Sequence, residues 1–175
     1  MKKESGITGI VEFAVAILIM MFIFRLMFNN GLIIRFLYDD QITSEVQLEK
    51  CTDGDTAHFM IAGEDVTVRF LAIDTPETKH PAKGEEPFGR EASEYTCSAL
   101  QKATVIELEY DEGSDREDKY GRQLAWVFID GDLLQEHLVE LGYAKVAYLY
   151  GDYKYTDQLL EAEKRAKGSN LGIWE

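Results

Sequence analysis

The stretch Val66 to Glu77, which reads VTVRFLAIDTPE, constrains the fold of this chain most. Residues 66–73 alternate between two faces at the two-residue period of a strand, and a proline, which cannot donate to a ladder, then ends it. The strand therefore delivers Asp74 and Glu77 at its mouth. Arg69 is a charged residue among β-branched and aromatic neighbours, where burial requires a partner or a ligand. One cation and two carboxylates on a strand and its exit turn predict a functional site.

A long apolar run lies near the N-terminus. Residues 13–24 carry no charge, and Ile7 to Phe28 is long enough to cross a bilayer if Glu12 and Arg25 lie near its ends. We expect a single-pass membrane anchor, because the segment is apolar on every face. A signal peptide and a buried core helix are the alternatives, although no small-x-small cleavage site follows the run.

The anchor predicts two parts, residues 1–38 as the membrane anchor with its flank and residues 39–175 as the folded domain. Basic residues lie on both sides of the apolar run, so they decide its orientation poorly. The positive charge of the free amino terminus slightly favours the orientation in which the C-terminal domain is extracellular.

The folded part predicts an α+β domain. Strands are expected over residues 45–50, 55–62, 66–73, 104–110 and 124–129, and helices near 88–100, 133–141 and 156–167. These elements do not follow a repeating βαβ order, which argues for a small antiparallel barrel rather than a doubly wound sheet. We therefore expect a five-stranded OB-like β-barrel with three helices, preceded by the transmembrane helix.

Three further stretches carry polar groups in patterns that suit a site. They are Asp53-Gly54-Asp55-Thr56, Asp118-Lys119-Tyr120-Gly121-Arg122 and Lys145-Val146-Ala147-Tyr148. Taken singly, each has an ordinary structural interpretation: an Asp-Gly turn, a solvated turn, and a strand with an exposed tyrosine.

Together with the DTPETKHP run that begins at Asp74, these stretches resemble the staphylococcal (micrococcal) nuclease or thermonuclease family. The motifs follow in the family's order, and the resemblance extends from about Glu45 to Trp174. It implies an OB-fold barrel with helices packed on it and a calcium-dependent phosphodiesterase site.

The resemblance also implies the ligands of the metal. Asp55 and Asp74 would bind Ca²⁺ with their carboxylates, and Thr75 would add its backbone carbonyl. Asp53 would lie beside the metal without binding it. The chemistry agrees, because a hard cation prefers oxygen ligands and this chain has no His or Cys cluster at zinc spacing.

Catalytic roles are implied for three more residues. Glu77 would position or deprotonate the attacking water, and Arg69 and Arg122 would hold phosphate oxygens as negative charge accumulates on them. Contacts with the nucleotide are implied for Lys83, Lys119, Tyr120 and Tyr148.

The expected function is a membrane-tethered, calcium-dependent endonuclease with a monomeric catalytic domain. It would hydrolyse DNA and RNA with low sequence specificity, favour single-stranded or locally open substrate, and leave 3′-phosphates. The alternative is a catalytically silent OB-fold module that binds nucleic acid or protein. Such a module need not keep all five of the central residues, which are Asp55, Arg69, Asp74, Glu77 and Arg122. A third interpretation is a small membrane adaptor whose acidic domain binds basic partners. It explains the net charge but not why Arg69 and the set of carboxylates are present.

The charge of the chain departs from what a nucleic-acid-binding surface usually carries. The net charge is -14, with 18 basic and 32 acidic residues. Four of those basic and two of those acidic residues precede Asp39, which leaves 14 against 30, or -16, for the folded part. Such a surface repels nucleic acid at long range, so we expect weak, salt-sensitive binding held locally by a few cations or a metal.

Two cysteines, Cys51 and Cys97, are the only ones in the sequence. They fall in different predicted elements, a strand and a helix. We expect two independent buried thiols, with a disulfide as the open alternative.

Overall fold

A computed structural model describes residues 43–78 and 84–175 of the chain, which belong to the unit Ile42–Glu175. The expected membrane anchor and Lys83 lie outside the described residues. Among the helices that are described, none is long and apolar enough to cross a membrane.

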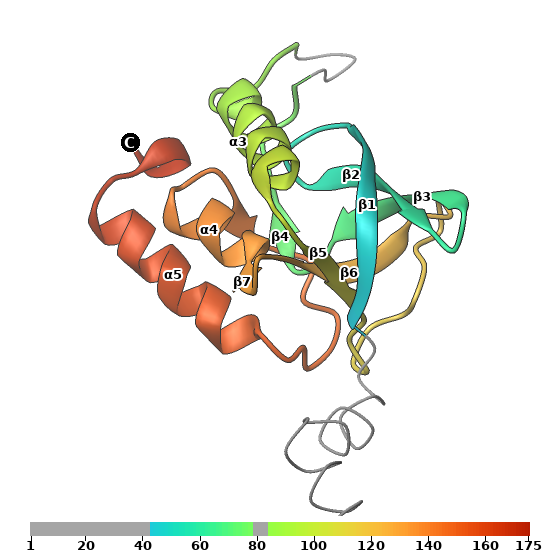
Figure 1. The fold of residues 1–175 in the computed structure, drawn as a ribbon. Helices are drawn as coiled ribbons and strands as arrows, with labels where there is room; N and C mark the ends of the chain where they lie inside the picture. Colours follow the sequence, from blue (N-terminus) through green and yellow to red (C-terminus); the bar gives the residue numbers. More distant parts are fainter. Residues whose placement is uncertain (1–42, 79–83) are drawn as a thin grey trace, which may run out of the picture. The chain divides into compact units, whose positions relative to one another are not determined.

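Five strands form the barrel that the sequence predicts (Figure 1). They are β1 (Thr43–Cys51), β2 (Thr56–Ile61), β3 (Glu64–Phe70), β5 (Ile106–Glu109) and β6 (Gln123–Ile129). Successive neighbours pair antiparallel in the order β3-β2-β1-β5-β6, and a parallel pairing of β3 with β6 closes the ring. This closure places the end of β3 beside the start of β6, where the polar stretches converge.

Three α-helices accompany the barrel, as expected: α3 (Gly89–Lys102), α4 (Leu134–Glu140) and α5 (Thr156–Gly168). A 3₁₀ helix, η1 (Gly172–Trp174), follows α5. Helices α4 and α5 pack side by side, with α4 next to the barrel strand β6 (Figure 1). Gln135 of α4 fixes this contact, because its side chain accepts from Val127 N–H and donates to the Ala125 carbonyl.

The core combines the inward side chains of the strands with the apolar faces of the helices. Its largest fully buried members include Trp126, Phe59, Phe70, Ile73, Leu100, Leu108, Leu134, Leu138 and Leu159. Along β3, buried Val68 and Phe70 alternate with less buried residues, as expected of a strand with one face in the core, whereas three consecutive residues of β6, Ala125 to Val127, are buried.

The strand predicted to run to Ile73 is interrupted, and this part of the prediction was wrong. Strand β3 ends at Phe70, and Ala72 adopts a left-handed backbone with φ 60°. Leu71, Ala72 and Ile73 are all buried, whereas a continuous strand with one face in the core would bury only every second residue. Residues 73–74 form a separate short strand, β4 (Ile73–Asp74), paired antiparallel with β8 (Lys145–Val146).

Two further short strands accompany the barrel, of which β7 was not predicted. Strand β7 (Asp132–Leu133) extends the sheet by pairing with β6. Strand β8 is the paired part of the segment that was expected to be extended near Lys145.

The expectation of two independent thiols was also wrong. Cys51 and Cys97 form a disulfide that links the end of β1 to α3, with a Cα to Cα distance of 5.5 Å. The sequence did not favour this pairing because the two residues are 46 positions apart and their proximity depends on how α3 packs against the barrel.

Candidate active site

The guanidinium of Arg69 lies between two acidic side chains at the end of β3. Its Nη1 atom is 2.6 Å from Asp55 Oδ2, and its Nη2 atom is 3.4 Å from Asp74 Oδ1. Only 11% of the Arg69 side chain and 8% of the Asp55 side chain are exposed. The buried charge that the sequence singled out therefore has its partners, and these come from the β1–β2 turn and from β4.

Strand β4 gives Asp74 two further partners. Lys145 Nζ on β8 lies 2.9 Å from Asp74 Oδ2, and the Tyr148 hydroxyl donates to Oδ1 at 3.3 Å. The Arg69 Cζ atom is also 5.6 Å from the centre of the Tyr148 ring, at cation–π distance. Burial raises the pKa of the Tyr148 hydroxyl, and Asp74 adds to the effect.

The turn between β1 and β2 holds Asp55 in place. Asp55 Oδ2 accepts a hydrogen bond from the Thr75 N–H at 3.0 Å, and the Asp55 carbonyl accepts from the Phe70 N–H at 2.8 Å. Both Asp55 and Thr75 are buried. The turn, the end of β3 and β4 therefore form one rigid corner.

Carboxylates are crowded at this corner. Burial raises the pKa of Asp53 to about 6, and the negative charges of Asp55 and Glu77 contribute to the increase. Glu77 follows β4 in the chain and is exposed. An excess of anionic oxygen beside one arginine is the setting in which a hard divalent cation is stabilised.

Arg122 belongs to a second group in the loop before β6. Its Nη2 and Nε atoms lie 2.7 and 2.8 Å from Asp118 Oδ2, and its guanidinium stands over the Tyr120 ring. Burial alone would raise the pKa of Asp118, but hydrogen bonds from Arg122 and from the Tyr120 N–H outweigh it and lower the pKa. Asp118 therefore orients the Arg122 side chain, whereas Asp55 and Asp74 orient Arg69.

The predicted nucleotide contacts fall in different places. Lys119 and Tyr120 are exposed in the Arg122 loop, with Lys119 Nζ 4.9 Å from the centre of the Tyr120 ring. Tyr148 adjoins Arg69, and Lys83 lies outside the described residues. The exposed aromatic rings offer stacking surfaces for unpaired bases.

Two residues at the site were missed from the sequence. Lys145 pairs with Asp74, and this hydrogen bond raises the pKa of the lysine. Thr96 of α3 donates from Oγ1 to the Gly54 carbonyl at 2.7 Å. Lys145 stood within a motif that was noted only for its tyrosine, whereas nothing in the local sequence marks Thr96.

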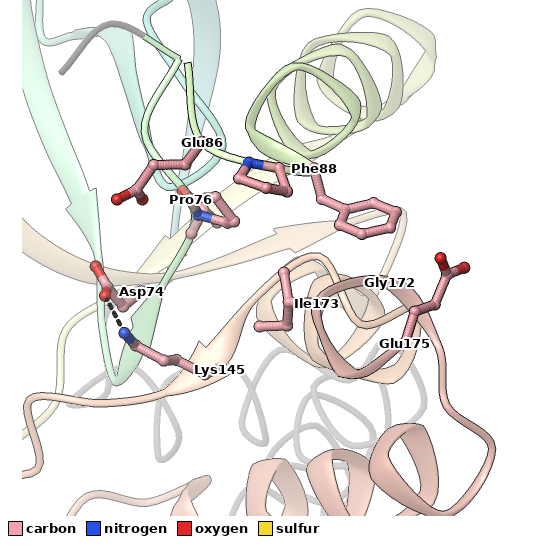
Figure 2. Close-up of a pocket in the computed structure, with 10 residues that line it drawn as sticks. Asp74, Pro76, Glu86, Phe88, Lys145, Gly172, Ile173 and Glu175 are labelled. Atoms are coloured by element: carbon pink, nitrogen blue, oxygen red, sulfur yellow. Dashed lines mark ion pairs between the residues drawn. The ribbon is translucent and has the colours of Figure 1, made fainter. Parts of the chain in front are cut away.

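An open pocket of about 420 Å³ adjoins the corner. Figure 2 shows the Asp74–Lys145 ion pair at one end and Phe88 and Glu175 at the other. Asp74 and Thr75 therefore line an open space large enough for part of a ligand.

The candidate metal ligands are Asp55, Asp74 and Thr75. Within residues 43–78 and 84–175, no group of three or more His, Cys, Asp or Glu side chains is arranged as a metal site. The two carboxylates and one backbone carbonyl are hard oxygen donors, and Asp53 and Glu77 add negative charge nearby, so the donor set fits Ca²⁺ in kind.

Comparison with known proteins supports the resemblance to the nuclease family that the sequence motifs indicated. A family model described as Staphylococcal nuclease homologue matches residues 67–175. The chain is 33% identical over 175 residues to the thermonuclease of Staphylococcus intermedius, which covers 100% of this chain and 99% of that protein.

Two proteins of Bacillus subtilis (strain 168) are also similar. The SPbeta prophage-derived endonuclease YokF is 45% identical over 131 residues, covering 74% of this chain and 44% of that protein. Endonuclease YncB is 45% identical over 130 residues, covering 74% of this chain and 61% of that protein. The matched region is less than two thirds of the length of either Bacillus protein.

The barrel, the order of the motifs and these matches agree with one another. The chain belongs to the staphylococcal nuclease homologue family.

Proposed function

We propose that this protein is a calcium-dependent phosphodiester hydrolase, an endonuclease that cleaves DNA and RNA with low sequence specificity. The observation that carries the proposal is the position of Arg69 between Asp55 and Asp74 in one buried corner. The names of the relatives, thermonuclease and endonuclease, support the same reaction class.

Asp55 and Asp74 would hold Ca²⁺ with their carboxylates and Thr75 with its backbone carbonyl, and the bound ion would polarise a phosphoryl oxygen. The Thr75 N–H fixes the orientation of Asp55, while β4 fixes that of Asp74. These residues are therefore ordered before a ligand arrives, which reduces the entropic cost of binding.

Arg69 is suited to stabilise the charge that develops on the phosphate. Its planar guanidinium is nearly buried, so its interaction with a phosphate oxygen would be weakly screened. Asp55 and Asp74 prevent the side chain from adopting other rotamers. Preorganised donors of this kind act at no reorganisation cost when the reaction occurs.

Glu77 would orient or deprotonate the attacking water, since its carboxylate lies near the anionic corner without a role in the barrel core. Arg122, which Asp118 orients, would provide a second guanidinium for the phosphate. The hydrolysis would leave 3′-phosphates, as the resemblance to the family implies.

The substrate is proposed to be single-stranded or locally open nucleic acid. Tyr120 and Tyr148 are 72% and 51% exposed, which leaves their rings accessible for stacking. The acidic surface leaves only a few local cations to contact the phosphates, so we expect weak binding that depends on the salt concentration.

We further propose that the domain is monomeric and acts outside the cell membrane, tethered by the N-terminal apolar run. The Cys51–Cys97 disulfide supports this location, since disulfides persist in oxidising compartments. A catalytically silent module is the competing function, and the retention of both arginines and the acidic set argues against it.

The test is cleavage of single-stranded DNA by the full-length protein in detergent. We expect activity with Ca²⁺, little or none with Mg²⁺ or a chelator, and a loss of about 100-fold or more in Glu77→Gln. Glu94→Gln, an exposed change on α3, serves as the matched control and should retain activity. Equal cleavage in chelator, or an unimpaired Glu77→Gln, would contradict the proposal.

A further inference from the structure

The turn that carries Asp53 and Asp55 is fastened to α3 at two points. Cys51, which ends β1, forms the disulfide with Cys97. The neighbouring residue of α3, Thr96, is fully buried and donates from its hydroxyl to the Gly54 carbonyl at 2.7 Å. Adjacent residues of one helix therefore hold both the strand that enters the turn and the centre of the turn.

The turn has little freedom to shift without disturbing the site. A Cβ atom at Gly54 would lie 2.8 Å from Thr75 Oγ1, so the glycine is packed directly against that side chain. The next residue, Asp55, accepts from the Thr75 N–H and pairs with Arg69. A displacement of the turn would change the position of the Asp55 carboxylate relative to both partners.

We propose that the Cys51–Cys97 disulfide and Thr96 act as positioning residues for the Asp53–Asp55 turn, and that the activity of the protein consequently depends on the thiol–disulfide state of its surroundings. The inference rests on the proposed function, because its consequence is a change in Ca²⁺ binding and cleavage.

Both cysteines are half-buried, so a small reductant can reach the bond. Reduction breaks the sulfur–sulfur bond and forms two thiols, while a dithiol supplies two electrons and two protons and becomes a disulfide. In the reduced protein the covalent link is lost, and the Thr96 hydrogen bond to the Gly54 carbonyl remains. The protein would thus be fully active in oxidising surroundings and weakened where thiols are kept reduced.

The experiment compares oxidised and dithiothreitol-reduced full-length protein in detergent. Calcium binding is measured by calorimetry, single-stranded DNA cleavage is measured across a Ca²⁺ titration, and amide hydrogen exchange is followed at residues 52–56. We expect reduction to raise the half-saturating Ca²⁺ concentration about tenfold, the lower end of the effect of residues that orient metal ligands. Exchange in the turn should become faster.

Variants separate positioning from general loss of stability. The double variant Cys51→Ser/Cys97→Ser should show the calcium affinity and turn exchange of the reduced protein, and dithiothreitol should not change either. Thr96→Val should weaken Ca²⁺ binding in the same direction, and Thr96→Ser should restore it. Leu159→Ala, in the core on α5, lowers stability through a cavity far from the turn in sequence and should leave the calcium affinity unchanged.

The proposal is overturned if the reduced protein, still folded by circular dichroism, keeps the calcium affinity and turn exchange of the oxidised protein. Absence of Ca²⁺-stimulated cleavage in the oxidised wild type would instead contradict the proposed function. In that case the exchange rates of residues 52–56 in the two redox states still decide whether the disulfide positions the turn.

Discussion

The Nη1 atom of Arg69 lies 2.6 Å from Oδ2 of Asp55, and this ion pair joins the end of β3 to the turn before β2. Both side chains are nearly buried, so neither charge would be tolerated alone. The same carboxylate accepts from the Thr75 N–H, which links the pair to β4. Arg69 and Asp55 therefore combine a structural contact with the groups proposed to act on a phosphodiester.

Asp118 is expected to control Arg122. Asp118→Asn would remove the charge that holds the guanidinium while preserving the size of the side chain, so Arg122 would sample other rotamers. We expect cleavage of single-stranded DNA, measured as kcat/KM, to fall roughly 10- to 100-fold, because a misplaced guanidinium loses its stabilisation of the transition state.

The control for this prediction lies in the same loop. Asp115→Asn makes an identical chemical change at an exposed residue and should leave kcat/KM close to that of the wild type. A wild-type rate in Asp118→Asn would show that Arg122 does not need this partner.

Asp111 should be important for stability rather than for chemistry. The buried carboxylate accepts from Trp126 Nε1 and from the Lys154 N–H, both at 2.8 Å, and joins the loop that starts at Asp111 to the segment before α5. Asp111→Ala would leave these donors unsatisfied, and we expect unfolding free energy to fall by on the order of 3 kcal/mol.

Urea denaturation followed by tryptophan fluorescence measures this loss. Asp132→Ala, at an exposed position in β7, should change the midpoint little. An Asp111→Ala variant as stable as Asp132→Ala would mean that water replaces the missing acceptor.

The stability of the domain should also depend on alkaline pH through Lys154. The hydrogen bond to Glu109 is the largest cause that raises the pKa of Lys154 to about 12, from an ordinary 10.5. Because the folded-state pKa is the higher one, the stabilisation is fully present below 10.5 and is lost as the pH rises through about 12.

Denaturation curves between these pH values test this dependence. The wild type should lose stability more steeply than Lys154→Met, in which the titrating group is absent. Since 47% of the lysine side chain is exposed, the difference should be small, and it should shrink at high salt. Parallel pH curves for the two proteins would exclude the lysine as the source.

Most of the architecture could be predicted from local patterns. The alternation of Val66, Val68 and Phe70 indicated β3, and the helical spacing after Phe88 indicated α3, because both periodicities follow from burial on one face. The break at Ala72 could not be predicted. Its left-handed backbone depends on tertiary bonds, including Leu71 N–H to the Ala125 carbonyl.

In the candidate site, too, features set by local sequence could be predicted and those set by tertiary contacts could not. Arg69 was recognisable because a charge within an apolar strand needs a partner, and its partners were among the acidic residues singled out. The Lys145–Asp74 pair, the Thr96–Gly54 hydrogen bond and the disulfide were not. Each joins residues that are distant in sequence, and only the packing of β8 or α3 brings them together.

The most direct test of the account is the cleavage rate of Arg69→Lys. This change keeps a positive charge beside Asp55 and Asp74 but removes the planar guanidinium that contacts two oxygens at once. With saturating Ca²⁺ and circular dichroism like that of the wild type, we predict that kcat on single-stranded DNA falls by about 100-fold or more. A folded Arg69→Lys protein that cleaves at the wild-type rate would contradict the claim that this arginine stabilises the scissile phosphate.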